Sequence, residues 1–305
     1  MSNKIDFFKN LEPYSNCKDH TVSGEHFKVM INKEFEMLVT QPVPKNLSNY
    51  YQSEDYISHT DSKKTLFDKI YQAVKNITLR RKLRLINESL RIQNSDTRPE
   101  KNLLDVGAGT GDFLKICKNN SWNTFGIEPD EGARASAKNK GIVLREDLSN
   151  FKNQTFEIIT LWHVLEHVEN LSEYISNLKK LLSTHGRLII AAPNFKSDDA
   201  NYYKEFWAAF DVPRHLWHFS QDSIRQLFLS ENMVIEKTIP MKFDSYYVSL
   251  LSEKYKKGRM NIVNALYRGF VSNCKAMTSS EYSSLIYVIK RAPSPGLEPG
   301  SLDGH

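Results

Sequence analysis

The sequence contains few cysteines and no long apolar run. Its three cysteines are odd in number and scattered over 305 residues, which argues against a disulfide framework and suits a reducing compartment. The sequence has no run of the roughly 20 apolar residues that a membrane-spanning helix needs, so we expect no transmembrane segment. The opening residues, MSNKIDFFKN, are too polar for a secretory signal peptide. These absences together predict a cytoplasmic protein.

Strong charge of either sign is also lacking. The formal net charge is +5, and basic residues gather in only two stretches, RRKLR at Arg80–Arg84 and KYKKGR at Lys254–Arg259. Such stretches suit nucleic acid or anionic lipid, but neither follows a known RNA-binding pattern. Solvated faces of surface helices are the commoner explanation, so we do not favour nucleic acid as a partner.

The middle of the chain alternates short apolar runs with amphipathic segments. Strand-like runs at 102–106, 124–128, 156–162 and 186–192 are separated by helical patterns at 111–119, 131–139 and 171–182. Apolar runs without polar alternation indicate strands that are buried on both faces, and helical crossovers between them indicate a parallel sheet. The sequence therefore predicts a doubly wound α/β domain.

The flanking segments divide the rest of the chain. We predict an N-terminal cap over 1–62, a helical connection over 63–98, and the α/β domain over 99–291, with a helical insertion around 244–274. A long aromatic-rich connection, 194–220, follows the strand at 186–192, and long connections of this kind are usually functional. Residues 292–305 combine proline, glycine and polar residues, which predicts a disordered tail.

A glycine-rich loop, LLDVGAGTGDFL, follows the strand at 102–106. Gly107 and Gly109 fit a dinucleotide fingerprint, but the third glycine comes one residue early, at Gly111, which disfavours NAD. Glu128 ends the next strand, where its carboxylate could accept from both ribose hydroxyls of an adenosine. Asp147, near the end of a third strand, could accept from an adenine amino group. The loop thus predicts a nucleotide-like ligand.

These motifs, with GIEP, REDL, FEIITLWHVLEHV and LLSTHGRLIIAAPN, resemble class I S-adenosylmethionine-dependent methyltransferases, most closely the quinone-pathway O-methyltransferase group. The resemblance implies a Rossmann-like, seven-stranded, mostly parallel sheet whose last strand is antiparallel, with a small N-terminal cap. It also implies a set of residues that contact S-adenosylmethionine, namely Asp105, Gly107, Ala108, Gly109, Gly111, Glu128, Pro129, Asp147, Leu148, Trp162 and His163.

Candidate substrate residues come from two segments after these strands. His163 lies at the exit of the strand at 156–162, and DVPRHLWHFS contributes His215 and His218 as further catalytic candidates and Arg214 and Trp217 as substrate contacts. The alternative is that these aromatic and basic side chains only pack the connection onto the sheet. His167 is expected to be structural. Metal ligation here is not expected, because the spacing offers no second pair of ligands.

The N-terminal segment resembles a zinc ribbon that has lost ligands. Cys17 and His20 have the spacing of a first pair, but the second pair falls near Asn32 and Phe35, which cannot replace thiolates. We therefore expect no zinc and a small β-hairpin cap. Downstream, Tyr56 is a candidate substrate contact, and with Tyr50 or His59 it could cover the cofactor.

The sequence therefore predicts a methyltransferase that moves the methyl group of S-adenosylmethionine to an oxygen or carbon of a small-molecule or lipid-like acceptor. Methylation of RNA or protein, supported only by the two basic stretches, is an enzymatic alternative. A cofactor-binding module without catalysis is the other alternative. The identity of the acceptor, the need for a general base and the oligomeric state stay open.

Overall fold

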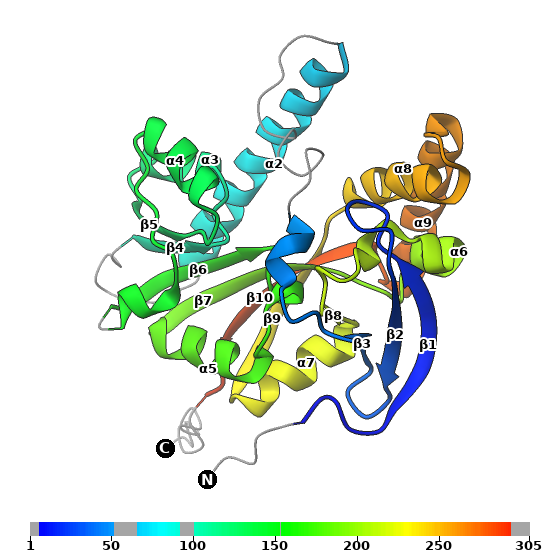
Figure 1. The fold of residues 1–305 in the computed structure, drawn as a ribbon. Helices are drawn as coiled ribbons and strands as arrows, with labels where there is room; N and C mark the ends of the chain where they lie inside the picture. The colour runs from blue at the N-terminus through cyan, green and yellow to red at the C-terminus, as the bar shows by residue number, and fades with distance from the viewer. Residues whose placement is uncertain (1–5, 52–65, 92–100, 153, 294–305) are drawn as a thin grey trace, which may run out of the picture.

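A computed structural model of the chain describes residues 6–51, 66–91, 101–152 and 154–293. A sheet of six strands lies at its centre, and Figure 1 shows how the helices surround it. The order is β5-β4-β6-β7-β10-β9. The pairs β4 with β5, β4 with β6, and β6 with β7 are parallel, and β10 is antiparallel to both of its neighbours. The strands are β4 (Asn102–Val106), β5 (Asn123–Ile127), β6 (Phe156–Trp162), β7 (Leu182–Pro193), β9 (Met233–Pro240) and β10 (Ser284–Arg291).

The expected α/β class and the antiparallel last strand are confirmed, but the number of strands differs. The segment before Asp147 was expected to form a strand and makes only an isolated bridge, between Ile127 and Arg145. Two backbone hydrogen bonds hold it, from Glu128 N to Arg145 O and from Arg145 N to Gly126 O, each 2.9 Å long. The segment borders solvent, with Val143 exposed, and no strand among the described residues pairs with its outer side.

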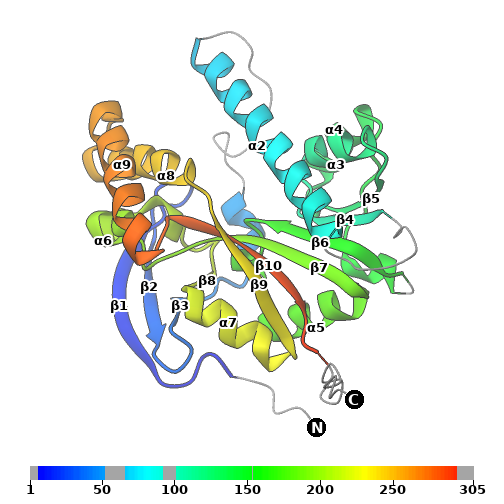
Figure 2. The same ribbon diagram turned by 180° about the vertical axis from the view of Figure 1, so that it is seen from behind.

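Helices cover both faces of this sheet because its strands are apolar in consecutive positions. Leu103, Ile158 and Ile189 pack with α2 (Leu66–Arg91), α3 (Asp112–Lys118) and α4 (Glu131–Asn139). The next residues along the same strands, Leu104, Ile159 and Ile190, pack with α5 (Leu171–Leu181) and α7 (Gln221–Ser230) on the opposite face. Side chains alternate between the faces of a strand, so an unbroken apolar run indicates a sheet buried on both sides. Figure 2 shows the molecule from the side of α2.

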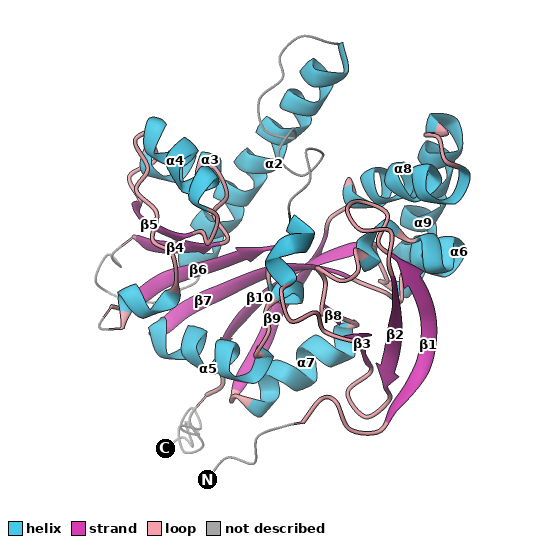
Figure 3. Ribbon diagram, viewed as in Figure 1, coloured by secondary structure: helices cyan, strands magenta, loops and turns pink. Residues whose placement is uncertain are grey.

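A second, smaller sheet lies beside the first, and Figure 3 shows the two groups of strands separately. Its order is β1-β2-β3-β8, with β1 (Leu11–Lys18), β2 (His26–Asn32), β3 (Met37–Gln41) and β8 (Trp217–His218). The N-terminal segment was expected to form a small hairpin. It forms three strands of a four-stranded antiparallel sheet, and the connection after β7 supplies the fourth strand, β8, at the edge. Val39 pairs with Trp217 and Leu38 with His218. The N-terminal segment is not a self-contained cap.

The connection after β7 and the segment after β9 are largely helical. The connection contains α6 (Asp198–Tyr203), the 3-10 turns η4 (Lys204–Phe206) and η5 (Ala208–Phe210), and β8. The segment expected to be helical at 244–274 forms α8 (Asp244–Lys257) and α9 (Ile262–Ser279). Three further 3-10 turns are η1 (Leu47–Tyr51), η2 (Leu148–Phe151) and η3 (Leu165–His167). Over the described ranges, none of the helices combines the length and the apolar character needed to cross a membrane.

Two expected features fall partly or wholly outside the described residues. Of the tail expected at 292–305, residues 294–305 lie outside the described residues. The candidate lid residues Tyr56 and His59 also lie outside them. Within the described cap, Cys17 is buried with its Sγ 3.7 Å from Ser15 Oγ, and the His20 ring stacks on Tyr255. Asn32 accepts a hydrogen bond from Phe35 N. The residues at the positions where a zinc ribbon has its metal ligands thus make packing and hydrogen-bond contacts within the fold.

Candidate functional site

The glycine loop joins β4 to α3, and its three glycines have different roles. All three have left-handed backbone angles, with φ of 71° at Gly107, 53° at Gly109 and 76° at Gly111. A Cβ on Gly107 would lie 2.4 Å from Val164 Cγ2, and one on Gly111 would lie 3.1 Å from Ala137 Cβ. A Cβ on Gly109 would meet no atom within 4 Å. The outer two glycines thus allow close packing, and the middle one leaves a side of the loop open to a ligand.

Glu128 fastens this loop to the end of β5. Its Oε2 accepts a hydrogen bond from Gly109 N at 2.8 Å, and its Oε1 accepts one from Asp130 N at 3.0 Å. The side chain is half-buried, and each carboxylate oxygen can accept a further hydrogen bond. The position predicted for a ribose-binding acid therefore lies directly beside the open part of the loop.

Asp105 lies beneath the loop and is 2% exposed. Burial raises its pKa to about 7, although the Thr160 hydroxyl donates to Oδ1 at 2.6 Å and Lys82 lies nearby. Burial also lowers the pKa of Lys82 on α2 to about 8, against the attraction of Asp105 and Asp244. Lys82 was not among the residues expected at the site. It belongs to the RRKLR stretch, whose helical spacing could have indicated one side chain turned toward the sheet.

Trp162 ends β6 next to this pair. The Lys82 Nζ lies 4.2 Å from the centroid of a Trp162 ring, and the Phe113 ring meets the indole edge-on at 5.7 Å. The indole Nε1 is buried and, within the described parts of the chain, has no hydrogen-bond partner. A buried donor without a partner costs free energy, so a ligand oxygen or a water at this position would be favourable.

The remaining predicted cofactor residues lie around the ends of the same strands. Ala108 N donates to Ile127 O at 2.8 Å, and Pro129 is exposed directly after Glu128. Asp147 is exposed, and its Oδ1 accepts from Ser149 N at 2.7 Å. Hydrogen bonds from the side chain and the backbone N–H of Ser149 lower the Asp147 pKa. Leu148 is half-buried at the start of η2.

His163 leaves the end of β6 with a left-handed backbone, φ 57°. Its Nδ1 lies 3.4 Å from Glu166 Oε1, and its Nε2 lies 3.2 Å from Asp244 Oδ2 at the start of α8. Burial would lower the His163 pKa, but the two carboxylates outweigh burial and raise it to about 10. The imidazole is therefore a cation at neutral pH, with both ring nitrogens facing carboxylates.

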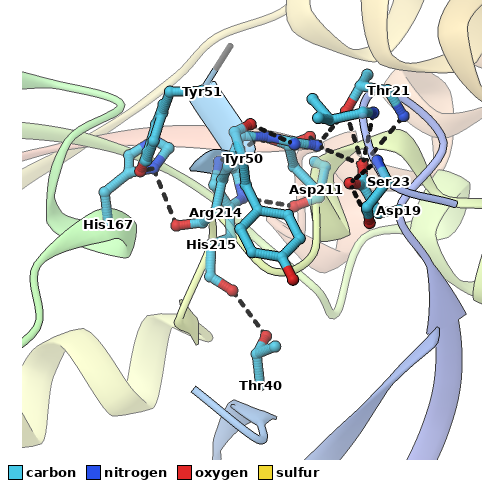
Figure 4. A network of polar contacts seen from close by, with 12 residues as sticks. Asp19, Thr21, Ser23, Thr40, Tyr50, Tyr51, His167, Asp211, Arg214 and His215 are labelled. Atoms are coloured by element: carbon cyan, nitrogen blue, oxygen red, sulfur yellow. Dashed lines mark hydrogen bonds and ion pairs between the residues drawn. The ribbon is translucent and has the colours of Figure 1, made fainter. Parts of the chain in front are cut away.

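The predicted substrate residue Arg214 is instead a buried anchor (Figure 4). Its Nε and Nη2 donate to Asp211 at 3.0 and 2.6 Å, its Nη1 donates to Tyr50 O at 2.9 Å, and its Nη2 also reaches Asp19 at 3.1 Å and the Thr21 hydroxyl. Burial would raise the Asp19 pKa, but hydrogen bonds from Ser23 and Thr21 and the charge of Arg214 lower it strongly. The guanidinium joins the N-terminal sheet to the connection, so these contacts favour an anchoring role over the expected contact with substrate.

Trp217, His215 and His218 are also buried, and each has a partner within the fold. Trp217 Nε1 donates to Val168 O at 2.6 Å, and His215 Nδ1 lies 2.9 Å from Ala209 O. The Thr40 hydroxyl donates to His215 O, so it accepts from His218 Nε2 at 3.0 Å. Burial lowers the His218 pKa to about 3, which keeps the ring neutral. These contacts favour the packing role that the sequence left open.

One group of side chains could hold a cation. Ligand atoms of Glu166, His167 and His215 lie within 4.8 Å of one another. The sequence missed this group because its members come from η3 and from the connection, 48 positions apart in the chain. Glu166 is fully buried, and His163, His215 and His167 together overcome its desolvation and lower its pKa to about 2. The imidazolium of His163 already balances this carboxylate, so we assign no metal to the group.

Comparisons with known proteins find similarity to methyltransferases. The family described as methyltransferase domain matches residues 78–237, just over half of the chain. An uncharacterized methyltransferase of Alkaliphilus oremlandii (strain OhILAs) is 29% identical over 102 residues, which are 32% of this chain and 47% of that protein. The chain thus spans about half the length of this curated relative.

Solved structures share the fold at low identity. The magnesium protoporphyrin IX methyltransferase of Synechocystis PCC 6803, with bound S-adenosylhomocysteine, aligns with a TM-score of 0.52 and 15% identity over 82% of this chain and 100% of that one. A plantazolicin methyltransferase, in complex with a desmethyl analogue of plantazolicin and S-adenosylhomocysteine, aligns with a TM-score of 0.51 and 14% identity over 80% and 93%. At these identities, both likenesses show a shared fold.

Proposed function

The chain belongs to the methyltransferase domain family, and from this premise we propose that it transfers the methyl group of S-adenosylmethionine to a small-molecule or lipid-like acceptor. The observation that carries the proposal is the open side of the loop at Gly109, with Glu128 hydrogen-bonded to the same residue. Structural neighbours whose own ligands are S-adenosylmethionine or S-adenosylhomocysteine, and small-molecule or peptide acceptors, support it. We propose 99–291 as the catalytic domain.

The residues around the loop fit S-adenosylmethionine. Glu128 would accept from the ribose hydroxyls while keeping its bonds to the loop, and the loop backbone at Ala108 and Gly109 would lie against the ligand. Asp147 and Leu148 would border the adenine. Trp162 has a buried indole donor that needs an acceptor. When bound, the cofactor supplies a methyl group on a sulfonium, which an acceptor attacks in line.

The protein's own contribution to this reaction is positioning and exclusion of water, not proton abstraction. His163 was a candidate base, but the cation between two carboxylates has no lone pair to offer at neutral pH. His215 and His218 are buried and bonded within the fold. We therefore propose that none of the three histidines is a general base and that the ion pair of His163 with Asp244 positions α8 beside the cofactor.

Replacing Glu128 tests the cofactor site. In Glu128→Ala, each charge-assisted hydrogen bond to the ribose that is lost weakens binding by roughly 1.5 to 3 kcal/mol. We expect the dissociation constant for S-adenosylmethionine, measured by calorimetry, to rise at least tenfold. Glu131→Ala, an exposed acid three residues further on, is the matched control and keeps wild-type affinity. Full affinity in Glu128→Ala would refute the ribose assignment.

Labelling identifies the acceptor class. The protein is incubated with methyl-labelled S-adenosylmethionine and a cell extract, which is then separated into lipid, small-molecule, RNA and protein fractions. We expect label in the lipid or small-molecule fraction. Label in RNA or protein would favour the alternative for which the basic stretches at Arg80–Arg84 and Lys254–Arg259 are the support. Binding of the cofactor with no label in any fraction would indicate a module without catalysis.

A further inference from the structure

Helix α9 exposes its large apolar side chains and buries its small ones. Its exposed stripe, called the α9 face below, consists of Val263, Leu266, Tyr267, Phe270 and Met277, which are 80, 54, 58, 58 and 75% exposed. Offsets of three, four, seven and fourteen residues place them on one side of the helix. The buried residues of the helix are the small ones, Ala265, Gly269, Ser272 and Ala276.

The buried side of α9 is tightly packed against α8. A Cβ on Gly269 would lie 2.7 Å from Tyr246 Cδ1, so α8 and α9 pack too closely for any larger residue there. The Ser245 hydroxyl donates to Gly269 O across the same contact. The packing of α9 is therefore complete without the α9 face. An apolar stripe of this size left in water is typical of a docking surface.

The surroundings of the α9 face are basic. Lys256, Lys257 and Arg259 lie exposed at the end of α8 and in the turn that leads into α9. From 244 to 279 the chain has six Lys or Arg but only two acidic residues. One of these, Glu253, is fully buried and pairs with Lys257 at 2.8 Å, and the other, Asp244, faces His163, so Lys256 and Arg259 supply most of the free positive charge in the turn. Figures 1 and 2 both place α8 and α9 beside α6, at an edge of the molecule away from α3 and α4.

We propose that the α9 face and the adjoining basic turn dock on the surface of an anionic lipid bilayer. A helix with an apolar stripe and neighbouring lysines and arginines lies in the interface, its apolar side chains among the acyl chains and its cations at the headgroups. A second copy of the chain would bring like charges together, and RNA would leave the apolar stripe without a partner. The proposal does not depend on methyl transfer, because binding is measured without turnover.

The position of α8 connects this surface with the candidate site. The helix begins at Asp244, which pairs with His163 at the end of β6, and it ends at Lys257 next to the basic turn. Helix α8 thus links the end of β6 to the proposed docking surface.

Co-sedimentation of the full chain with vesicles tests the proposal. We expect binding to vesicles of phosphatidylglycerol and phosphatidylcholine, weak binding to phosphatidylcholine alone, and weaker binding at higher salt. Leu266→Gln with Phe270→Gln should weaken binding at least tenfold, and Lys256→Glu with Arg259→Glu about tenfold or more. The matched control, Val143→Gln with Leu229→Gln, changes two apolar residues that are as exposed but lie elsewhere, and should bind like the wild type.

Three results would overturn the proposal. One is an absence of vesicle binding by the wild type, and another is equal binding by the α9 variants. The third is a dimer in sedimentation velocity that only the α9 variants lose, which would assign the face to a second copy. Glu128→Ala is expected to bind vesicles normally, so a failure of the proposed cofactor site and a failure of membrane docking give different results. Circular dichroism checks that every variant is folded.

Discussion

His163 shows how the fold sets the protonation state of a single side chain. Two carboxylates, one from η3 and one from α8, lie within 3.4 Å of its ring nitrogens and raise its pKa from 6.5 to about 10. In the unfolded chain the same imidazole would lose its proton near its ordinary pKa. Folding is therefore linked to the protonation of this residue.

This linkage predicts a stability change in alkaline solution. Because the folded pKa is raised, the contribution of His163 is fully present below pH 6.5 and is lost as the pH rises through about 10. The side chain is 36% exposed, so solvent screening reduces the contribution to about 1 to 2 kcal/mol. Urea unfolding at pH 6 and pH 9.5 should show this loss in the wild type and in the control His185→Gln, but not in His163→Gln. An equal loss in all three proteins would contradict the assignment.

At the scale of elements, the loop between β4 and α3 is fixed by its contact with the exit of β6. Gly107 touches Val164 so closely that a methyl group would lie 2.4 Å from Cγ2. The same residue needs a left-handed backbone, with φ 71°. Packing and backbone conformation therefore both require glycine at this position.

Two alanine variants separate these requirements. Gly258 at the end of α8 also has φ 71°, but a Cβ there would meet no atom within 4 Å. Gly258→Ala should cost about 1 kcal/mol of unfolding free energy, from the backbone alone. Gly107→Ala should cost about 1 to 3 kcal/mol more, from overpacking, and should also weaken cofactor binding. Equal losses in chemical denaturation would show that Val164 gives way and that the contact does not fix the loop.

At the scale of the molecule, the N-terminal sheet and the catalytic sheet are joined through the connection after β7. This connection supplies β8 to the smaller sheet, and Arg214 within it binds Asp19 and Asp211. Removing one partner of a buried ion pair leaves the other charges uncompensated, which costs about 3 to 5 kcal/mol. The two sheets should therefore lose stability together.

Arg214→Met is expected to lower the unfolding free energy by about 3 to 5 kcal/mol. It should keep a single unfolding transition in calorimetry, because the two sheets lose stability together. Arg225→Gln is the matched control, because Arg225 forms an exposed pair with Asp222 that should contribute less than about 1 kcal/mol. A variant Arg214→Met with normal stability and a raised KM for the acceptor would instead return Arg214 to the substrate site.

The central fold was predictable because its signals are local. Uninterrupted apolar runs at β4, β6 and β7 indicated strands buried on both faces, and the helical patterns between them indicated crossovers. The segment before Asp147 was wrongly expected to be a full strand: Ile142 and Leu144 are buried as in a strand, but the segment makes only an isolated bridge. Whether such a segment pairs over its length depends on its neighbours, which the sequence does not show.

The sequence by itself determined the α/β class, the glycine loop with its left-handed positions, and the place of Glu128, since each depends on residues close together in the chain or at the ends of adjacent strands. Only the tertiary structure decided what the charged side chains of LWHVLEHV and DVPRHLWHFS do. Arg214 meets Asp19 across 195 positions, and His163 meets Asp244 from another helix. Burial and charge partners set the role of an ionisable group, and both arise only when distant segments come together.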